Sequence, residues 1–358
     1  MAFGVAILVN GSVDNDLTAA ATVEIDERAG QPTRYRLHFP LTISGGDLPL
    51  LTDDRIGPGA QLAVVAETDS ARACLVWGPV TGQHASLVHG GTNSTLVVEG
   101  ADASVMMGRE DRAEVWADVS DSDVVSTVAG RHGFTSDAQD TSTVHDEDVH
   151  ALVQRESDLD LLHRLARRNG YLAWLRSTEQ GQHTLSFRTP PLDGRPDAEL
   201  TINRSPQDGP PSVEVVDIWW DIERPTSTIA ADLDGRAKEA IDVTASSSSL
   251  PTLGSTPFSA VVGDGNRSVR LDAAADDSAD LSARANAALA EAAFFVRASG
   301  TTTAAALGTY LRAPSLVTLR GAGSRHSGPW LCTRVVHVVS DDSHTMQFEL
   351  ARNGWGST

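Results

Sequence analysis

The sequence predicts a mainly β (α+β) protein in which two similar β domains flank a helix-containing middle region. Short runs rich in Val, Ile, Leu and Thr, separated by turn residues, fill both ends of the chain, and helical apolar spacing appears between them. The strands expected at the two ends also follow one another in the same order and spacing. A single core usually stops growing at roughly 250 residues, and this chain has 358. We therefore expect three domains, over residues 1–118, 119–210 and 211–358.

The first domain is predicted from short apolar runs with strand composition. We expect its strands at residues 35–39, 61–66, 73–77 and 95–99. Between the first two of these runs, residues 53–59 combine aspartate, glycine and proline, which is typical of a turn.

Two helices are expected in the middle domain, over residues 120–133 and 157–170. Each begins with a Ser-Asp-x-Asp sequence that can cap a helix N-terminus, continues with apolar residues at helical spacing, and ends at a glycine. Position for position the two tracts read alike. The match is explained equally well by a duplication or by two uses of one capping solution.

The third domain is expected to begin after a segment with six prolines between residues 190 and 211. A strand is predicted at residues 213–222, a Ser-rich loop at 244–256 and a helix at 280–297, whose small apolar residues suit close packing on a sheet. Final strands are expected at residues 315–320, 330–339 and 345–351.

A weak internal repeat relates the two β regions. Residues 51–102 and 307–352 each run through a turn and three strands with similar gaps between them. The repeat predicts that the first and third domains share one fold.

Composition and charge exclude several classes of protein. The chain carries 28 basic and 48 acidic residues, a formal net charge of −20, and Lys238 is its one lysine. Proteins that bind nucleic acid need clustered cations, so no specific nucleic-acid partner is expected. Cys74 and Cys332 are far apart in apolar runs, without disulfide or zinc spacing. Residues 1–17 resemble neither a signal peptide nor a membrane span, so we expect synthesis in the bacterial cytoplasm and no membrane insertion.

One cluster of possible metal ligands occurs in the sequence, formed by His145, Asp146, Asp148 and His150 with Glu147 between them. Imidazole and carboxylate groups bind zinc, nickel or manganese, so a metal-dependent hydrolase is one hypothesis. The alternative is that this segment is an exposed acidic linker. In that case, replacing both His145 and His150 by alanine should leave the stability of the protein unchanged. No Gly-x-Ser-x-Gly nucleophile motif or phosphate-binding loop accompanies the cluster. We assign no catalytic, cofactor-binding or metal-binding residue and expect no enzyme.

Trp219 is the candidate interface residue. By strand alternation its indole lies on the face of Asp217 and Asp221, away from Ile218 and Trp220. An outward indole among carboxylates indicates a protein contact, although a second buried face of a barrel or sandwich explains it equally well.

The stretch QRESDLDLLHRLARRNGY at residues 154–171 resembles the phage late control protein D family, the tail baseplate hub family shared with the hub half of VgrG-like spikes. That family reads Gln, two spacers, Ser-Asp, an apolar pair, Arg-Leu-Ala, two spacers and Gly-Tyr at this place. The turn at 53–59, the tract 116–133 and the closing strands at 335–352 also resemble it. At residues 309–314 the sequence departs from the family's Gly-Asp-Pro-like turn.

The resemblance implies a structural baseplate hub without the needle, in a contractile phage tail or a phage-tail-like injection system. It implies that the two β domains are similar tube-like β-barrel domains and that the chain is a ring-forming homotrimer. The ring joins a separate trimeric spike to the hexameric inner tube, with wedge or LysM-type proteins beside it and no cofactor. Assembly then takes place in the tail or tail-like particle. The alternative from another class is a β-rich tail adhesion or binding module, and the metal-dependent hydrolase is a further one.

Overall fold

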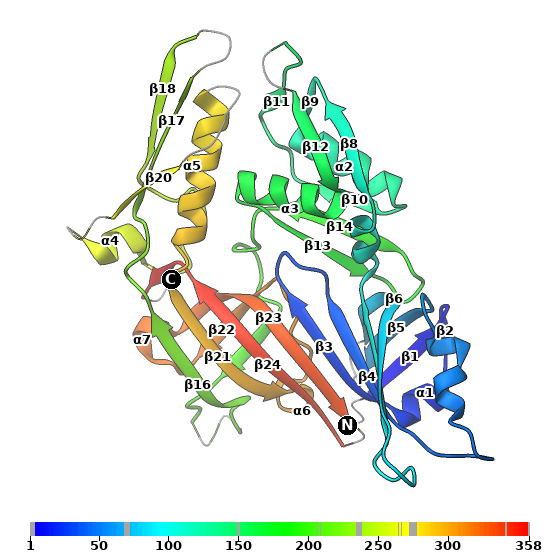
Figure 1. The fold of residues 1–358 in the computed structure, drawn as a ribbon. Coiled ribbons are helices and arrows are strands. Elements are labelled where there is room, and N and C mark those ends of the chain that lie inside the picture. Colours follow the sequence, from blue (N-terminus) through cyan, green and yellow to red (C-terminus); the bar gives the residue numbers. More distant parts are fainter. Residues whose placement is uncertain are drawn as a thin grey trace.

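The computed structural model is mostly β, with one large curved sheet and two projections above it (Figure 1). It describes residues 4–67, 72–148, 151–205, 207, 209–233, 238–263, 265, 267–271, 278–340 and 342–356. The sheet has 13 strands and contains both β regions predicted from the sequence. The predicted mainly β fold with a helix-containing middle region is confirmed.

The first half of the sheet comes from the N-terminal part of the chain. Its strands are β1 (Gly4–Val9), β2 (Ser12–Val13), β3 (Thr22–Arg28), β4 (Arg34–Pro40), β5 (Gln61–Glu67), β6 (Arg72–Ser86) and β7 (Thr95–Ala101). Short helices connect or follow them: α1 (Asn15–Ala20), η1 (Pro49–Thr52), η2 (Asp54–Ile56) and η3 (Ala103–Gly108). Alternating apolar residues of these strands, such as Val23 and Ile25, are fully buried.

The second half comes from the C-terminal part. Its strands are β15 (Ala198–Thr201), β16 (Val213–Trp220), β21 (Val296–Thr303), β22 (Ser315–Arg320), β23 (Gly328–Ser340) and β24 (Ser343–Arg352), with the short helices α6 (Ala304–Leu307) and α7 (Gly323–His326). Strand β3 pairs antiparallel with β23, which joins the halves into one sheet. A single hydrophobic core therefore runs beneath both halves, and it includes Ile25, Phe39, Trp330 and Phe348.

Both halves have the same strand order, which gives the internal repeat a structural basis. The order is β5-β6-β7-β4-β3 in the first half and β22-β23-β24-β21-β16 in the second. Each long strand, β6 or β23, carries a bulge where it pairs with the strand that follows it, at Thr81 against β7 and at Thr333 against β24; β6 has a further bulge, at Leu75, against β5. At both bulges the threonine hydroxyl donates to a carbonyl on the next strand, to Glu99 at 3.3 Å and to Glu349 at 3.1 Å. This shared irregularity aligns the two halves residue by residue.

The middle region forms one projection, with its own core. It contains β8 (Asp111–Trp116), β9 (Val119–Ser120), α2 (Asp121–Arg131), β10 (Thr135–Ala138), β11 (Val144–His145), β12 (Leu152–Ser157), α3 (Asp158–Asn169), β13 (Leu172–Ser177) and β14 (His183–Arg188). Ser120 and Ser157 cap the two helices as predicted. Both helices are followed by a glycine at positive φ, Gly133 and Gly170, where other residues are strained.

The repeated helix motif makes reciprocal contacts between α2 and α3. The first residue of each helix is a buried aspartate that binds the C-terminal end of the other helix. These contacts are Arg131 and His132 to Asp158, at 3.0 and 2.8 Å, and Arg168 and Asn169 to Asp121, at 3.1 and 2.6 Å. An aspartate at a helix N-terminus and an arginine at a C-terminus also favour the helix dipole. The motif therefore fastens the helix pair besides capping each member.

The second projection is inserted between β16 and β21. It contains β17 (Ser227–Leu233), β18 (Ala240–Ala245), β20 (Ser268–Leu271) and α5 (Ser278–Ala292), and nearby lie α4 (Phe258–Val262) and the small pair β19 (Thr256–Pro257) and β25 (Gly354–Trp355). Leu281, Ala285 and Leu289 of α5 pack on β17 and β18, as the small apolar stripe predicts.

The predicted helix at residues 280–297 ends earlier than expected, at Ala292. Phe295 instead turns into the main core, where its ring lies 4.8 Å from Phe258 and 5.6 Å from Trp355. The predicted strand at 213–222 likewise ends at Trp220.

Candidate functional site

The predicted interface residue Trp219 lies on β16, at the end of the sheet's strand order (Figure 1). Its indole is 48% exposed. On the other face of the strand, Val216 and Ile218 pack against the core, as predicted, whereas Trp220 is 51% exposed. Both indoles thus lie on an edge strand. The backbone groups of β16 on the side away from β21 have no strand beside them in the described part of the chain.

A second open edge lies on β6. Residues 72–79 of this strand pair with β5, and residues 80–86 pair only with β7, on the opposite side. The β5 side beyond Val80 therefore has no neighbouring strand among the described residues. The side chains of Gln83, His84, Ala85 and Ser86 are all exposed.

Where the two halves meet, a buried carboxylate contacts three parts of the chain. Glu27 of β3 is fully buried. Its oxygens lie 2.6 Å from Arg312 Nε, 2.9 Å from Arg176 Nη1 of β13, and 3.1 Å from the donating amide of Ala313. Arg312 also donates to the Cys74 carbonyl, at 3.1 Å. This cluster ties the middle region to both halves of the sheet.

Charge balance keeps this carboxylate ionised. Burial by itself raises the pKa of Glu27, but the neighbouring Arg312 and Arg176 guanidinium groups and His337 outweigh it and hold the pKa well below its ordinary value. Sequence analysis missed the cluster, although one signal was present: Glu27 follows Val23 and Ile25 on the inward face of a strand. Arg312 lies in the segment 309–314, where the sequence departs from the family turn.

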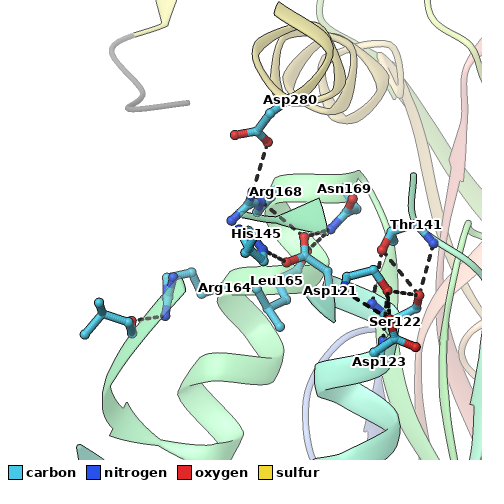
Figure 2. Close-up of polar contacts among 12 residues, drawn as sticks. Asp121, Ser122, Asp123, Thr141, His145, Arg164, Leu165, Arg168, Asn169 and Asp280 are labelled. Atoms are coloured by element: carbon cyan, nitrogen blue, oxygen red, sulfur yellow. Dashed lines mark hydrogen bonds and ion pairs between the residues drawn. The ribbon is translucent and has the colours of Figure 1, made fainter. Parts of the chain in front are cut away.

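His145 belongs to a buried network in the middle region, so the expectation of a solvated linker is wrong for this residue. It is fully buried, and its Nε2 lies 2.8 Å from Asp121 Oδ1 (Figure 2). Arg168 bridges Asp121 and Asp280 of α5, with contacts of 3.1 and 3.0 Å, so the network also joins the two projections. Burial raises the pKa of Asp121, but hydrogen bonding from His145 and the charge of Arg168 outweigh it and lower the pKa.

The other proposed metal ligands are not brought to this network. Glu147 and Asp148 are exposed, Asp146 is half-buried, and His150 lies outside the described residues. Within the described ranges, no group of three or more His, Cys, Asp or Glu side chains is arranged to hold a metal ion. In the same part of the chain no helix is both long and apolar enough to cross a membrane.

The repeated sheet, its open edges and the helical insertion can be compared with known proteins. A family model described as the Alg8 N-terminal domain matches residues 2–341. The chain belongs to this family. Among curated proteins none matches the sequence.

Solved structures of tail proteins share the fold over the whole chain. The 43 kDa tail protein of prophage MuSo2 from Shewanella oneidensis superposes with a TM-score of 0.69 at 12% identity, covering 98% of this chain and 99% of that one. A tail protein from Neisseria meningitidis MC58 gives 0.66 at 15% identity and covers both chains fully. A chain of the Francisella PdpA-VgrG complex gives 0.54 at 9% identity, covering 98% of this chain and 58% of that one. The fold predicted from the resemblance to the tail hub family is confirmed.

Proposed function

We propose that this chain is a structural baseplate hub of a contractile phage tail or phage-tail-like injection system, joining a trimeric spike to the hexameric inner tube. The observation that carries the proposal is the duplication of the sheet. The two halves share strand order and bulge position, and they lie side by side through the β3–β23 pairing. Three such chains in a ring present six similar β units, and a sixfold tube and a threefold spike can both match that arrangement.

The division into residues 1–118, 119–210 and 211–358 is part of this proposal. The first and last segments supply the ring, and the middle segment with the inserted α5 arm supplies outward contacts for wedge or LysM-type proteins. The function then lies in interfaces rather than in a catalytic centre, with no cofactor, and the chain works in the assembled particle. The structural tail proteins among its neighbours support this role.

Assembly with the spike tests the proposal. The chain is co-expressed with the spike protein of the same particle, and native mass spectrometry counts the copies in the complex. We expect three hub chains per spike trimer and a ring with six similar lobes in electron micrographs. A stable monomer, dimer or tetramer in the presence of the spike contradicts the hub role, and an autonomous monomer with glycan affinity favours the adhesion module.

A further inference from the structure

The intrachain joint between the two halves defines a strand register. In it, β3 lies antiparallel to β23 with Asp26 opposite Val336. The bulges align β6 with β23, so that His84 occupies the place of Val336. The same alignment extends to the next strands. Strand β4 pairs with β7 as β21 pairs with β24, and β3 pairs with β4 as β16 pairs with β21. Trp219 of β16 therefore occupies the place of Asp26 of β3.

A second pairing like that of β3 with β23 would need the equivalent strands, β16 and β6, and these are the two strands with open edges. Strand β16 corresponds to β3, and the distal part of β6 corresponds to the part of β23 that holds β3. We propose that β16 of one copy pairs antiparallel with residues 82–86 of β6 in a second copy, with Trp219 opposite His84. This inference rests on the proposed function, because it specifies how neighbouring copies of the ring meet.

The side chains at the two joints differ in a complementary way. At the intrachain joint the inward residue of the edge strand is Glu27, and it meets the large side chains of Arg312 and His337, at 2.6 and 3.7 Å. A small acidic side chain is therefore surrounded there by larger basic groups.

At the proposed joint the large side chain is on the other strand. Trp220 takes the place of Glu27 by the same alignment, with Gln83 directly opposite it in the place of Val335. Ala85 replaces His337, and Gly57, four residues before Gln61 as Arg312 is before Leu316, replaces Arg312. Gly57 and Ala85 are smaller than Arg312 and His337, so the indole would lie beside Gln83, whose side-chain amide donates to the Ile56 carbonyl at 2.7 Å. Trp220 is 51% exposed in the single chain. Its indole meets the ring of Trp355 edge-on, with the ring centroids 6.0 Å apart. A second copy would bury this surface, as aromatic anchors are buried at protein interfaces.

Exposed apolar residues accompany both edges. Beside the two tryptophans, Val215 is 65% and Ile222 is 39% exposed; at the end of β6, Leu87 is 59% and Val88 is 46% exposed. Single-chain proteins blunt an open sheet edge with charges or proline, whereas edges that accept another strand keep apolar neighbours. The distribution fits a partner that supplies a strand with matching apolar side chains, which a second copy does.

Paired cysteines test the register. Directly opposed residues of an antiparallel pair lie about 4.5–5.5 Å apart at Cα, within disulfide range. We expect the variant W219C/H84C, co-expressed with the spike and mildly oxidised, to give a reducible covalent trimer. The matched control W219C/Q83C places its thiols on opposite faces and should stay unlinked. The native Cys74 is buried, and burial raises its pKa to about 11, so it does not compete.

A second pair of variants tests whether Trp220 of one copy packs beside Ala85 of the next, while Trp220 itself is unchanged. Ala85→Arg fills the space on the inward face, and Ser86→Arg places the same side chain one residue along, on the outward face opposite Asp217. Both sites are exposed in the single chain, so both variants should fold and melt like the wild type. We expect Ala85→Arg to weaken association at least about thirtyfold, the loss typical of an interface anchor, and Ser86→Arg to weaken it less than about threefold.

The outcomes separate this inference from the hub role. Trimers that form in native mass spectrometry without a W219C/H84C link, or with an equal link in the control, overturn the register and leave the hub role standing. Equal association of the two arginine variants also overturns it. Absence of any trimer of the wild-type chain with the spike contradicts both proposals.

Discussion

Replacing Glu27 by glutamine keeps its shape and removes the charge at the joint between the two halves. Two guanidinium groups then lose their counter-charge, although Arg176 still donates to the Ala313 carbonyl at 2.9 Å and Arg312 to the Cys74 carbonyl. Removing one partner of a buried ion pair costs about 3–5 kcal/mol. The side chains of Arg176 and Arg312 are 27% and 20% exposed and keep some hydration. We therefore expect a loss of unfolding free energy at the lower end of this range, about 3 kcal/mol.

Urea unfolding followed by circular dichroism of the sheet measures this loss. With a slope of about 2–3 kcal/mol per molar urea, the urea midpoint of E27Q should fall by about 1–1.5 M. The control is E24Q on the outward face of the same strand, where Glu24 and Arg36 form an exposed pair at 3.3 Å. That change should cost no more than about 0.5 kcal/mol. Equal midpoints for E27Q and E24Q would refute the reasoning.

Acidity gives a second check on the same residue. The pKa of Glu27 is lowered in the folded chain, so its charge stabilises the fold at pH values above its ordinary value of 4.5. As the pH falls below 4.5 towards the lower folded pKa, the wild type loses this contribution and E27Q has none to lose. The gap between the two proteins should therefore narrow below pH 4.5, and a constant gap contradicts the assignment.

Three further predictions concern the interface, the buried network and acid stability. Trp219→Ala should leave the melting temperature of the single chain unchanged and weaken assembly by about 2 kcal/mol or more in light scattering; a lower melting temperature with unchanged association makes it a core residue. His145→Ala should cost about 1–3 kcal/mol in urea unfolding, because Asp121 loses a buried partner, whereas exposed Asp148→Ala should stay within about 0.5 kcal/mol. Burial and a neighbouring histidine lower the pKa of His344 to about 3, so its contribution is complete above the unfolded pKa of about 6.5 and is lost as the pH falls. His344→Gln should remove about 2 kcal/mol of the loss between pH 6.5 and 4.5, and an unchanged pH profile contradicts this.

Local physics made much of the fold predictable from the sequence. Two-residue alternation identified the strand that begins at Val213, and Ser120 and Ser157 marked the helix starts because a serine side chain can satisfy free backbone amides. The internal repeat also followed from the residue pattern, which placed Trp219 on the face opposite Ile218 but left open whether that face is exposed or buried. These features depend on neighbours within a few positions, which the sequence displays directly.

The candidate site depended on distant residues. Glu27 meets Arg312 across 285 positions of the chain, and β3 meets β23 over a similar separation. Alternation with Val23 and Ile25 could have indicated that Glu27 points inward, but it does not identify the partners of Glu27. The same limit applies to His145, whose acidic neighbours in the sequence suggested exposure while its contact, Asp121, lies 24 residues earlier.

The sequence by itself determined several of the strands, where the two middle helices begin, and that one β unit occurs twice, because hydrophobic period and capping act locally. Only the tertiary structure decided that the two units share one sheet, that β16 and the end of β6 remain open, and that the helix after residue 278 stops at Ala292 so that Phe295 can fill the core. Strand edges pair through backbone groups that every residue carries, so the choice of partner is set by the packing of the whole chain rather than by the side chains of either strand.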